Sequence, residues 1–226
     1  DTSPSQSKQK PKSKKAEKKE AALKKSAPKK SYDEDLGETE KRYAAAKSVK
    51  MAVKKSLILS VLERTDVYDG LFFLSGTEKL RLEFEKPVKS VAVVNGKDFW
   101  VIEYPPEDVD DKVRVLKSTL GEKSQSQILV TSLMGRGRIL DHFAVESKKK
   151  KDGKIVFKMK ATGDNSEIKN LELVLSEGDR LINEINYEDE LENKTKFEFS
   201  NIEFDSDVPD KLFKYSPPKG AEINQL

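Results

Sequence analysis

The chain has 226 residues, of which 37% are charged and 35% are apolar, and it contains no cysteine. The lack of cysteine excludes disulfides and thiolate metal sites, and it leaves no residue in this sequence for an N-terminal lipid anchor. No window holds about 18 consecutive apolar residues, so the sequence predicts no membrane-spanning helix. A signal-peptide pattern is also missing.

The positive charge is concentrated at the N-terminus. Residues 1–30 hold eleven lysines and three acidic residues, a net charge of +8, whereas the whole chain carries +3, so residues 31–226 carry −5. Because this charge lies outside the folded part, we predict no nucleic-acid binding. Residues 1–32 have almost no large apolar side chain, which indicates a disordered Lys-rich tail. The tail is either a solvated linker or a contact for anionic surfaces.

Residues 33–226 are predicted to form one domain that begins with a short amphipathic helix from Asp35 to about Lys47. The next segment, Val49 to Leu62, fits either one face of a helix or a strand by its spacing, and its β-branched content favours a strand. A second strand is predicted from Val67 to Leu74.

The clearest pattern is LRLEFEKPVKSVAVVNGKDFW, from Leu80 to Trp100. Apolar residues alternate with charged ones in its first strand, so Leu80, Leu82 and Phe84 share one face. Asn95-Gly96 is typical of a type I′ hairpin turn. Pairing outward from this turn places four residues on one face of the hairpin: Val91, Val93, Trp100 and Ile102.

Further strands are predicted after this hairpin, followed by a helix and then more strands. The strands lie at Lys112–Leu116, Ile155–Met159, Leu171–Leu175, Leu181–Tyr187, Phe197–Phe199 and Ile202–Phe204. Ser124 to Gln127 resembles a capping box, and the helix that it begins presents Leu129, Leu133 and Met134 on its apolar face. Roughly ten or eleven strands and two or three helices result, which predicts a mainly β protein. We expect a strongly curved antiparallel sheet with the helices on its concave face, around either a hydrophobic cavity or a filled core.

Catalytic and metal-binding patterns are nearly missing. His142 is the only histidine, and its surroundings favour a structural role over that of a base. The carboxylates between Asn186 and Lys194 lack the spacing of a calcium loop. Lys148 to Lys154 surrounds Asp152-Gly153, which is typical of an exposed hairpin. We therefore predict no catalytic residue, no metal and no cofactor.

Four stretches in order resemble the LolA family, whose members carry lipoproteins to the outer membrane. They are YAAAKSVKMAV, LRLEFEKP, VVNGKDFWVIEYP and NKTKFEFSNIEFDSDVPDKLFKYSPPKGAEI, and the resemblance extends from about Leu36 to Leu226. It implies an incomplete β-barrel closed by helices around a hydrophobic cavity for acyl chains. It also implies a periplasmic location in a Gram-negative bacterium and no enzymatic activity.

The resemblance further implies the partners and the site. The partners would be acylated lipoproteins, an inner-membrane lipoprotein-releasing ABC transporter and an outer-membrane receptor, LolB, or the membrane itself. We expect the carrier to be a monomer with Leu129, Leu133 and Met134 on a lid helix. The expected cavity residues are Leu80, Leu82, Phe84, Val91, Val93, Trp100, Ile102, Phe157, Met159, Phe197 and Phe199.

One feature of the family is missing from its usual place. The cavity arginine that tethers the lid of family members falls near Gly76, and the nearest arginine, Arg81, points outward by strand alternation. Apolar contact would then hold the lid. Two other interpretations stay open, a LolB-like outer-membrane receptor and a LolA-like sensor or interaction domain that binds a protein or lipid in its groove.

Overall fold

The computed structural model describes residues 33–106, 108–109, 112–120, 129, 132, 135, 137–163 and 168–225. The predicted tail of residues 1–32, the capping box at Ser124 to Gln127, and the lid residues Leu133 and Met134 lie outside these residues. The elements with defined bounds are one α-helix, two 3-10 helices and twelve strands. The helices are α2 (Glu34–Ala45), η2 (Ile139–Asp141) and η3 (Asp210–Phe213). The strands are β1 (Ser48–Leu59), β2 (Arg64–Ser75), β3 (Lys79–Lys86), β4 (Ser90–Asn95), β5 (Asp98–Glu103), β6 (Arg114–Thr119), β7 (Phe143–Lys151), β8 (Lys154–Ala161), β9 (Ile168–Ser176), β10 (Ile182–Asp189), β11 (Lys194–Phe204) and β12 (Glu222–Gln225).

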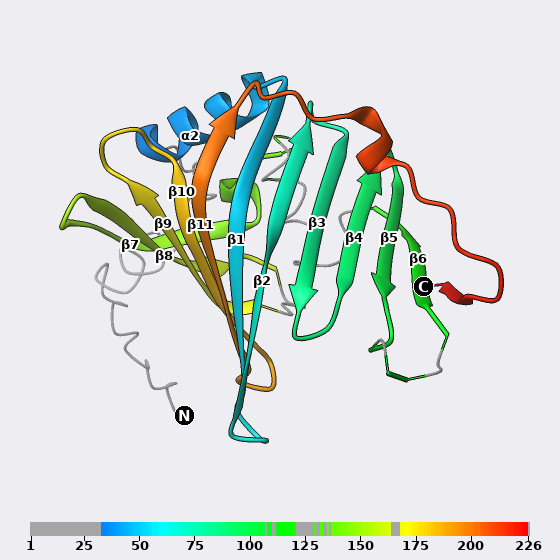
Figure 1. Ribbon diagram of the computed structural model, residues 1–226. Coiled ribbons are helices and arrows are strands. Elements are labelled where there is room, and N and C mark those ends of the chain that lie inside the picture. The colour runs from blue at the N-terminus through cyan, green and yellow to red at the C-terminus, as the bar shows by residue number, and fades with distance from the viewer. Residues whose placement is uncertain are drawn as a thin grey trace, which may run out of the picture. The chain divides into compact units, whose positions relative to one another are not determined.

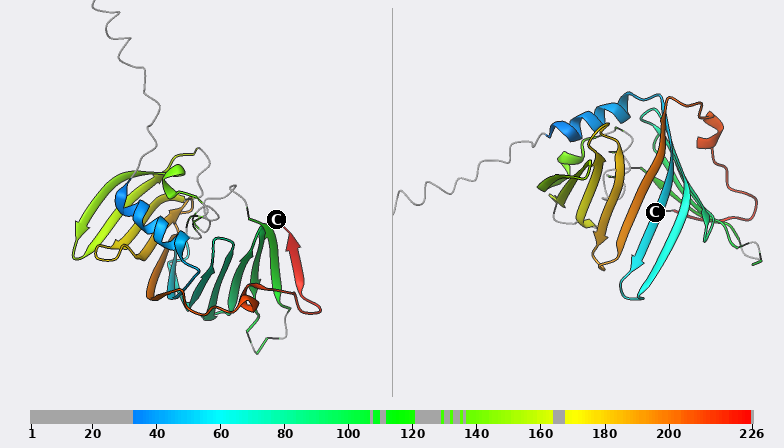
Figure 2. Two further views of the ribbon diagram at one scale, coloured as in Figure 1. Left: turned by 90° about the horizontal axis from the view of Figure 1, so that it is seen from above. Right: turned by 60° about the vertical axis from the view of Figure 1, so that its left-hand side comes forward.

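All twelve strands belong to a single sheet in the order β12-β6-β5-β4-β3-β2-β1-β11-β10-β9-β8-β7. Every neighbouring pair is antiparallel except β12 and β6, which are parallel. The sheet curves strongly and is not closed into a barrel (Figures 1 and 2). The predicted mainly β, curved antiparallel fold is confirmed, whereas the second and third helices are not. Among the described residues, no helix is long and apolar enough to cross a membrane.

Helix α2 lies on the concave face of the sheet and is capped by Asp33. The Asp33 carboxylate accepts hydrogen bonds from the backbone N–H groups of Asp35 (3.0 Å) and Leu36 (3.3 Å), two donors without partners inside the helix. Leu36, Thr39 and Tyr43 recur at helical spacing and are buried. The Tyr43 hydroxyl accepts a hydrogen bond from the backbone of Ile182. This apolar stripe fixes α2 on the sheet.

A group of charges reinforces the same contact. The carboxylate of Asp35 is buried and lies 2.5 Å from the Lys148 ammonium group and 2.6 Å from Arg180 Nε. The hydrogen bond from Lys148, and then that from Arg180, hold the pKa of Asp35 below its usual value. Since Lys148 lies on β7 and Arg180 precedes β10, these pairs connect the helix to two separate parts of the sheet.

A β-bulge explains the break in the alternation of β11. Between Lys50 and Ala52 of β1, the partner strand advances by one extra residue, and Asn201 adopts a φ of 52°. The extra residue restores the inward direction of Ile202 and Phe204, so they pack in the same core as Phe199. The two short strands expected here are therefore one strand.

The hairpin turn lies one residue later than predicted. Asn95 pairs with Asp98, so Gly96 and Lys97 are the central residues, and only Gly96 has a positive φ, 65°. This corresponds to a glycine at the first central position, as in a type II′ turn, and not to the predicted type I′. The face assignment of the hairpin survives, because the shift changes the pairing by two residues.

The register places four predicted cavity residues on the face opposite to Leu80, Leu82 and Phe84. Leu80 pairs with Val94, and Leu82 pairs with Ala92, so the inner face of β4 carries the even-numbered residues. The four residues Val91, Val93, Trp100 and Ile102 therefore lie on the outer face, opposite to Leu80, Leu82 and Phe84. The prediction assigned the faces within β3 and within the β4–β5 hairpin correctly. It did not fix the register between β3 and β4, which decides which face of the hairpin points inward.

The C-terminal segment covers this second apolar face. Val91, Val93, Ile102 and Val115 are buried there, and Tyr215 contacts Trp100 with 5.6 Å between ring centroids. Arg81, which points outward as predicted, donates a hydrogen bond of 3.1 Å to the carbonyl of Leu212 in η3. Figure 1 shows the segment leaving β11 and passing η3 to reach the β6 edge, where β12 pairs.

We expect Asp35→Asn to lower the free energy of unfolding by roughly 1–3 kcal/mol, between the values for exposed and buried ion pairs. Because the folded-state pKa of Asp35 is lowered, its stabilisation is present above about pH 4 and is lost as the pH falls through the folded-state value. Urea unfolding at several pH values measures this. Asp152→Asn, at an exposed turn, is the control and should change little. Equal losses for both variants at neutral pH would contradict the assignment.

Tyr215→Ala should move Trp100 emission to longer wavelength and increase its quenching by acrylamide, since the ring that covers Trp100 is removed. Tyr68→Ala, on the inner face, should leave the emission unchanged. Addition of an acyl-chain ligand to the wild type should also leave it unchanged. A change of Trp100 emission on ligand addition, with no effect of Tyr215→Ala, would instead place Trp100 on the inner face.

Candidate functional site

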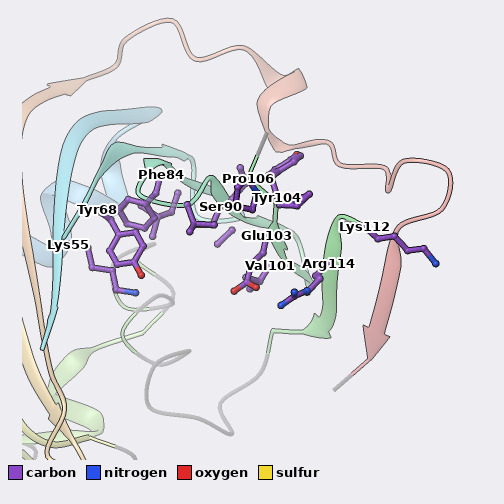
Figure 3. A pocket seen from close by; sticks show the side chains of 15 residues that line it. Lys55, Tyr68, Phe84, Ser90, Val101, Glu103, Tyr104, Pro106, Lys112 and Arg114 are labelled. Carbon is purple, nitrogen blue, oxygen red and sulfur yellow. The ribbon is translucent and has the colours of Figure 1, made fainter. Parts of the chain in front are cut away.

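The inner face of strands β1 to β6 carries a hollow of about 520 Å³ (Figure 3). Each strand contributes side chains to it, and the segments around β6 form its rim. The lining residues are Lys55, Tyr68, Leu82, Phe84, Val88, Ser90, Val91, Ala92, Val101, Glu103, Tyr104, Pro105, Pro106, Lys112 and Arg114. We call this space the inner hollow.

The size of the inward residues explains why this part of the sheet is hollow. On β4 and β5, Ser90, Ala92 and Val101 point inward, and none of them is fully buried. On β8 and β9 the inward residues are larger, and Ile155, Phe157, Met159, Leu171 and Leu175 are at most 2% exposed. Those larger side chains fill the space beneath α2. These larger residues therefore pack in one core beneath α2, and a further hollow of about 590 Å³ lies along β8 to β11, where Met159, Leu171 and Tyr187 line it.

Gly70 on β2 allows the close approach that places Phe84 in the hollow. A Cβ at Gly70 would lie 1.9 Å from the Glu83 carbonyl oxygen and 2.8 Å from a Phe84 ring carbon. The β2–β3 register also shifts between Asp69 and Gly70. The freed ring of Phe84 packs against Tyr68, with 5.7 Å between centroids. A glycine is therefore required here for packing.

Lys55 is a charged residue that lies next to the ring of Tyr68 in the hollow and lines it together with Phe84. It follows Val49, Met51 and Val53 in the inward register of β1, and all three of these are buried. Its ammonium nitrogen lies 5.3 Å from the Tyr68 ring centroid and 5.9 Å from that of Phe197. Burial lowers the pKa of Lys55 below its usual value. Burial raises the pKa of Tyr68, which keeps its phenol neutral at physiological pH.

A second, smaller space of about 40 Å³ lies beneath α2. Leu129 and Ser132, the described residues of the predicted lid segment, line it and have helical backbone. Leu129 is 7% exposed and packs in the inner core with Leu36 and Leu173. It does not face Trp100, which lies on the opposite side of the sheet.

The predicted cavity residues divide into three groups. Leu82 and Phe84 line the inner hollow, as does Val91, which also packs in the outer core. Leu80, Phe157 and Met159 are buried in the inner core, and Phe197 and Phe199 are half-buried against it. The third group, Val93, Trp100 and Ile102, forms the outer core.

Sequence reasoning missed other residues of the hollow, namely Lys55, Tyr68, Ala92 and Val101. Lys55 could have been found from its inward register after Val53 on β1. The chemistry available here is that of an apolar surface with a few polar groups at its edges. No group of three His, Asp or Glu residues that could hold a metal ion occurs among the described residues. The backbone of His142 donates to the Ile139 carbonyl and accepts from Thr162.

Comparison with known proteins decides the family. The model of the family described as outer membrane lipoprotein carrier protein LolA matches residues 45–216, more than half of the chain. The chain belongs to the LolA family. An outer-membrane lipoprotein carrier protein of Legionella pneumophila (strain Lens) is 24% identical over 154 residues, which cover 68% of this chain and 72% of that protein.

A second relative and one solved structure are also similar to the chain. The outer-membrane lipoprotein carrier protein of Methylococcus capsulatus is 25% identical over 154 residues, covering 68% of this chain and 70% of the relative. The crystal structure of an uncharacterized conserved protein from Thermus thermophilus matches with a TM-score of 0.51 and 13% identity, covering 85% of this chain and 98% of that chain. At that identity the second likeness shows the fold alone.

We expect Gly70→Ala to destabilise the protein by about 1–3 kcal/mol, since the added methyl group would collide with backbone at Glu83. Thermal unfolding followed by circular dichroism measures the loss. Gly178→Ala is the matched control, because no atom lies within 4 Å of a Cβ at that position. Equal melting temperatures for the two variants would show that β2 and β3 do not require this close approach.

Proposed function

We propose that this LolA-family chain is a periplasmic carrier that shields the acyl chains of lipoproteins in the inner hollow. The carrier would take its cargo from an inner-membrane ABC transporter and pass it to an outer-membrane receptor or to the membrane. The observation that supports this most is the unfilled apolar surface around Leu82 and Phe84 in a family of lipoprotein carriers. Its volume of about 520 Å³ lies within the range of roughly 300–1,000 Å³ for ligand pockets.

The physical chemistry of acyl chains explains the form of the site. Each buried methylene group is worth about 0.8 kcal/mol, so a released lipoprotein needs a shielded surface. A bilayer is equally apolar, and apolar contact alone gives no preference for the carrier over the membrane. The donor must therefore be driven, and the carrier needs an accessible hollow and no catalytic residue. The Lys-rich tail would add a salt-sensitive contact with anionic surfaces.

Leu82→Gln should weaken binding of a fluorescent dipalmitoylated peptide about tenfold, because it places an amide on the apolar surface of the hollow at a cost of roughly 1–3 kcal/mol. Fluorescence titration of the purified protein measures the dissociation constant. The variant should remain folded, since Leu82 is only partly buried.

Leu71→Gln is the matched control for this change. Leu71 lies on the neighbouring strand but is 36% exposed on the outer face, so its variant should bind the peptide as the wild type does. Equal weakening by both variants would mean that the inner hollow is not where the chains bind. A wild-type protein that binds no acylated peptide would overturn the proposed carrier function.

A further inference from the structure

The position of Lys55 is unusual for a lysine. Its neighbour Lys54 is exposed on the outer face of β1, whereas Lys55 projects into the inner hollow. A charged ammonium group on an apolar surface is costly unless a partner offsets the lost hydration. Among the described residues, no carboxylate forms an ion pair with Lys55 within 4.0 Å, and the partners are the rings of Tyr68 and Phe197. Such ring contacts offset only part of the cost, about 0.5–2 kcal/mol.

The rest of the hollow separates charge from apolar surface. Lys55 lies beside Tyr68 at one end, Glu103 and Arg114 lie farther along the hollow where their strands β5 and β6 pair, and Lys112 lies at the far end (Figure 3). The rest of the lining includes Leu82, Phe84, Ala92 and Val101 and the polar Ser90. The hollow thus offers mostly apolar surface beside a cation that lies near two aromatic rings.

We propose that the inner hollow binds an amphiphile with one anionic group, a phosphate or a carboxylate, which pairs with Lys55 while the acyl chain lies over Leu82 and Phe84. This inference rests on the hollow of the proposed function and adds a further ligand class, since the ester and amide groups that join acyl chains to a lipoprotein carry no charge. A phosphate or carboxylate oxygen satisfies an ammonium donor through a charge-assisted hydrogen bond, which is roughly twice as strong as a neutral one. In surroundings of low dielectric constant this pairing is stronger than in water.

The test compares ligands with the same chain and different head groups. Oleoyl lysophosphatidylglycerol carries a phosphate, oleate carries a carboxylate, and monoolein is neutral. Each is titrated by isothermal calorimetry, below the concentration at which it forms aggregates, into the full chain and its variants. Inorganic phosphate alone is a fourth ligand. The two anionic arms show which head group the site accepts.

Wild type should bind at least one anionic amphiphile about tenfold more tightly than monoolein, which corresponds to about 1.4 kcal/mol. Lys55→Met removes the charge at nearly constant length, so it should abolish this preference and leave monoolein binding within about twofold. Lys55→Arg should retain the preference. Lys54→Met, the adjacent exposed lysine, is the matched control and should behave as the wild type. Lys55→Met should melt no lower than the wild type, since a desolvated charge has been removed.

The contrary outcomes are distinct. If wild type binds monoolein as tightly as the anionic amphiphiles, the inference fails and the carrier function stands. If Lys54→Met lowers the preference as much as Lys55→Met does, the effect belongs to net charge, and the inference fails. If inorganic phosphate binds as tightly as the lipid, the site recognises a simple anion, and the inference of an amphiphile fails. If no amphiphile binds to the wild type although the dipalmitoylated peptide does, the inference fails alone, and if neither binds, the inference and the proposed function fail together.

Discussion

The alternation of side chains between the two faces of one open sheet is the constraint on which the rest of this structure depends. Every inward position must be filled by a side chain, covered by another element or left open to a ligand. On β8 and β9 large residues such as Phe157 and Leu171 pack with Leu36 of α2 in one core. On β4 and β5 Ser90, Ala92 and Val101 are too short to fill the curve of the sheet. Core and hollow are thus two outcomes of one pattern, decided by side-chain volume.

The outer face obeys the same constraint and needs its own cover. Without the C-terminal segment, Val91, Val93 and Ile102 would form an exposed apolar patch, which invites association between molecules. The segment is held by rings at Trp100 and Tyr215 and by polar contacts from Arg81 and Lys79. Arg81, the arginine nearest to the family's cavity position, thus lies on the outer face, where it holds the C-terminal segment in place.

Much of the fold could be predicted from the sequence, because period-two alternation is a local property. The strands around Leu80 to Phe84 and Ile155 to Met159, the helix after Asp33 and the mainly β class follow from it. The joining of strands into faces could not be predicted, because it depends on register across β3 and β4, which is set by contacts between separate hairpins. The short edge strand β12 also escaped prediction, since its residues are all exposed and no alternation marks them.

The site was less predictable than the fold for a related reason. A hollow is the space that the inward side chains leave unfilled. The alternation of apolar and polar residues predicts which side chains point inward, but it does not predict how much space they leave. Leu82 and Phe84 were identified because they alternate with charges. Lys55 was overlooked because a lysine in a strand usually indicates the solvent face, and only the register of Val53 on the same strand places it inside.

The pairing of β1 with β11 has a consequence for how the chain assembles. Strands β1 to β6 are joined by successive hairpin pairings, as are β7 to β11, so each half can form from neighbours in sequence. The ladder that unites them places Val49 opposite Phe204, and it can form only after nearly the whole chain has been synthesised. Until then one edge of β1 has no partner strand, and contacts so distant in sequence form slowly. The centre of the finished sheet therefore joins the most distant parts of the chain, and while β1 is unpaired its edge is one that other chains can reach.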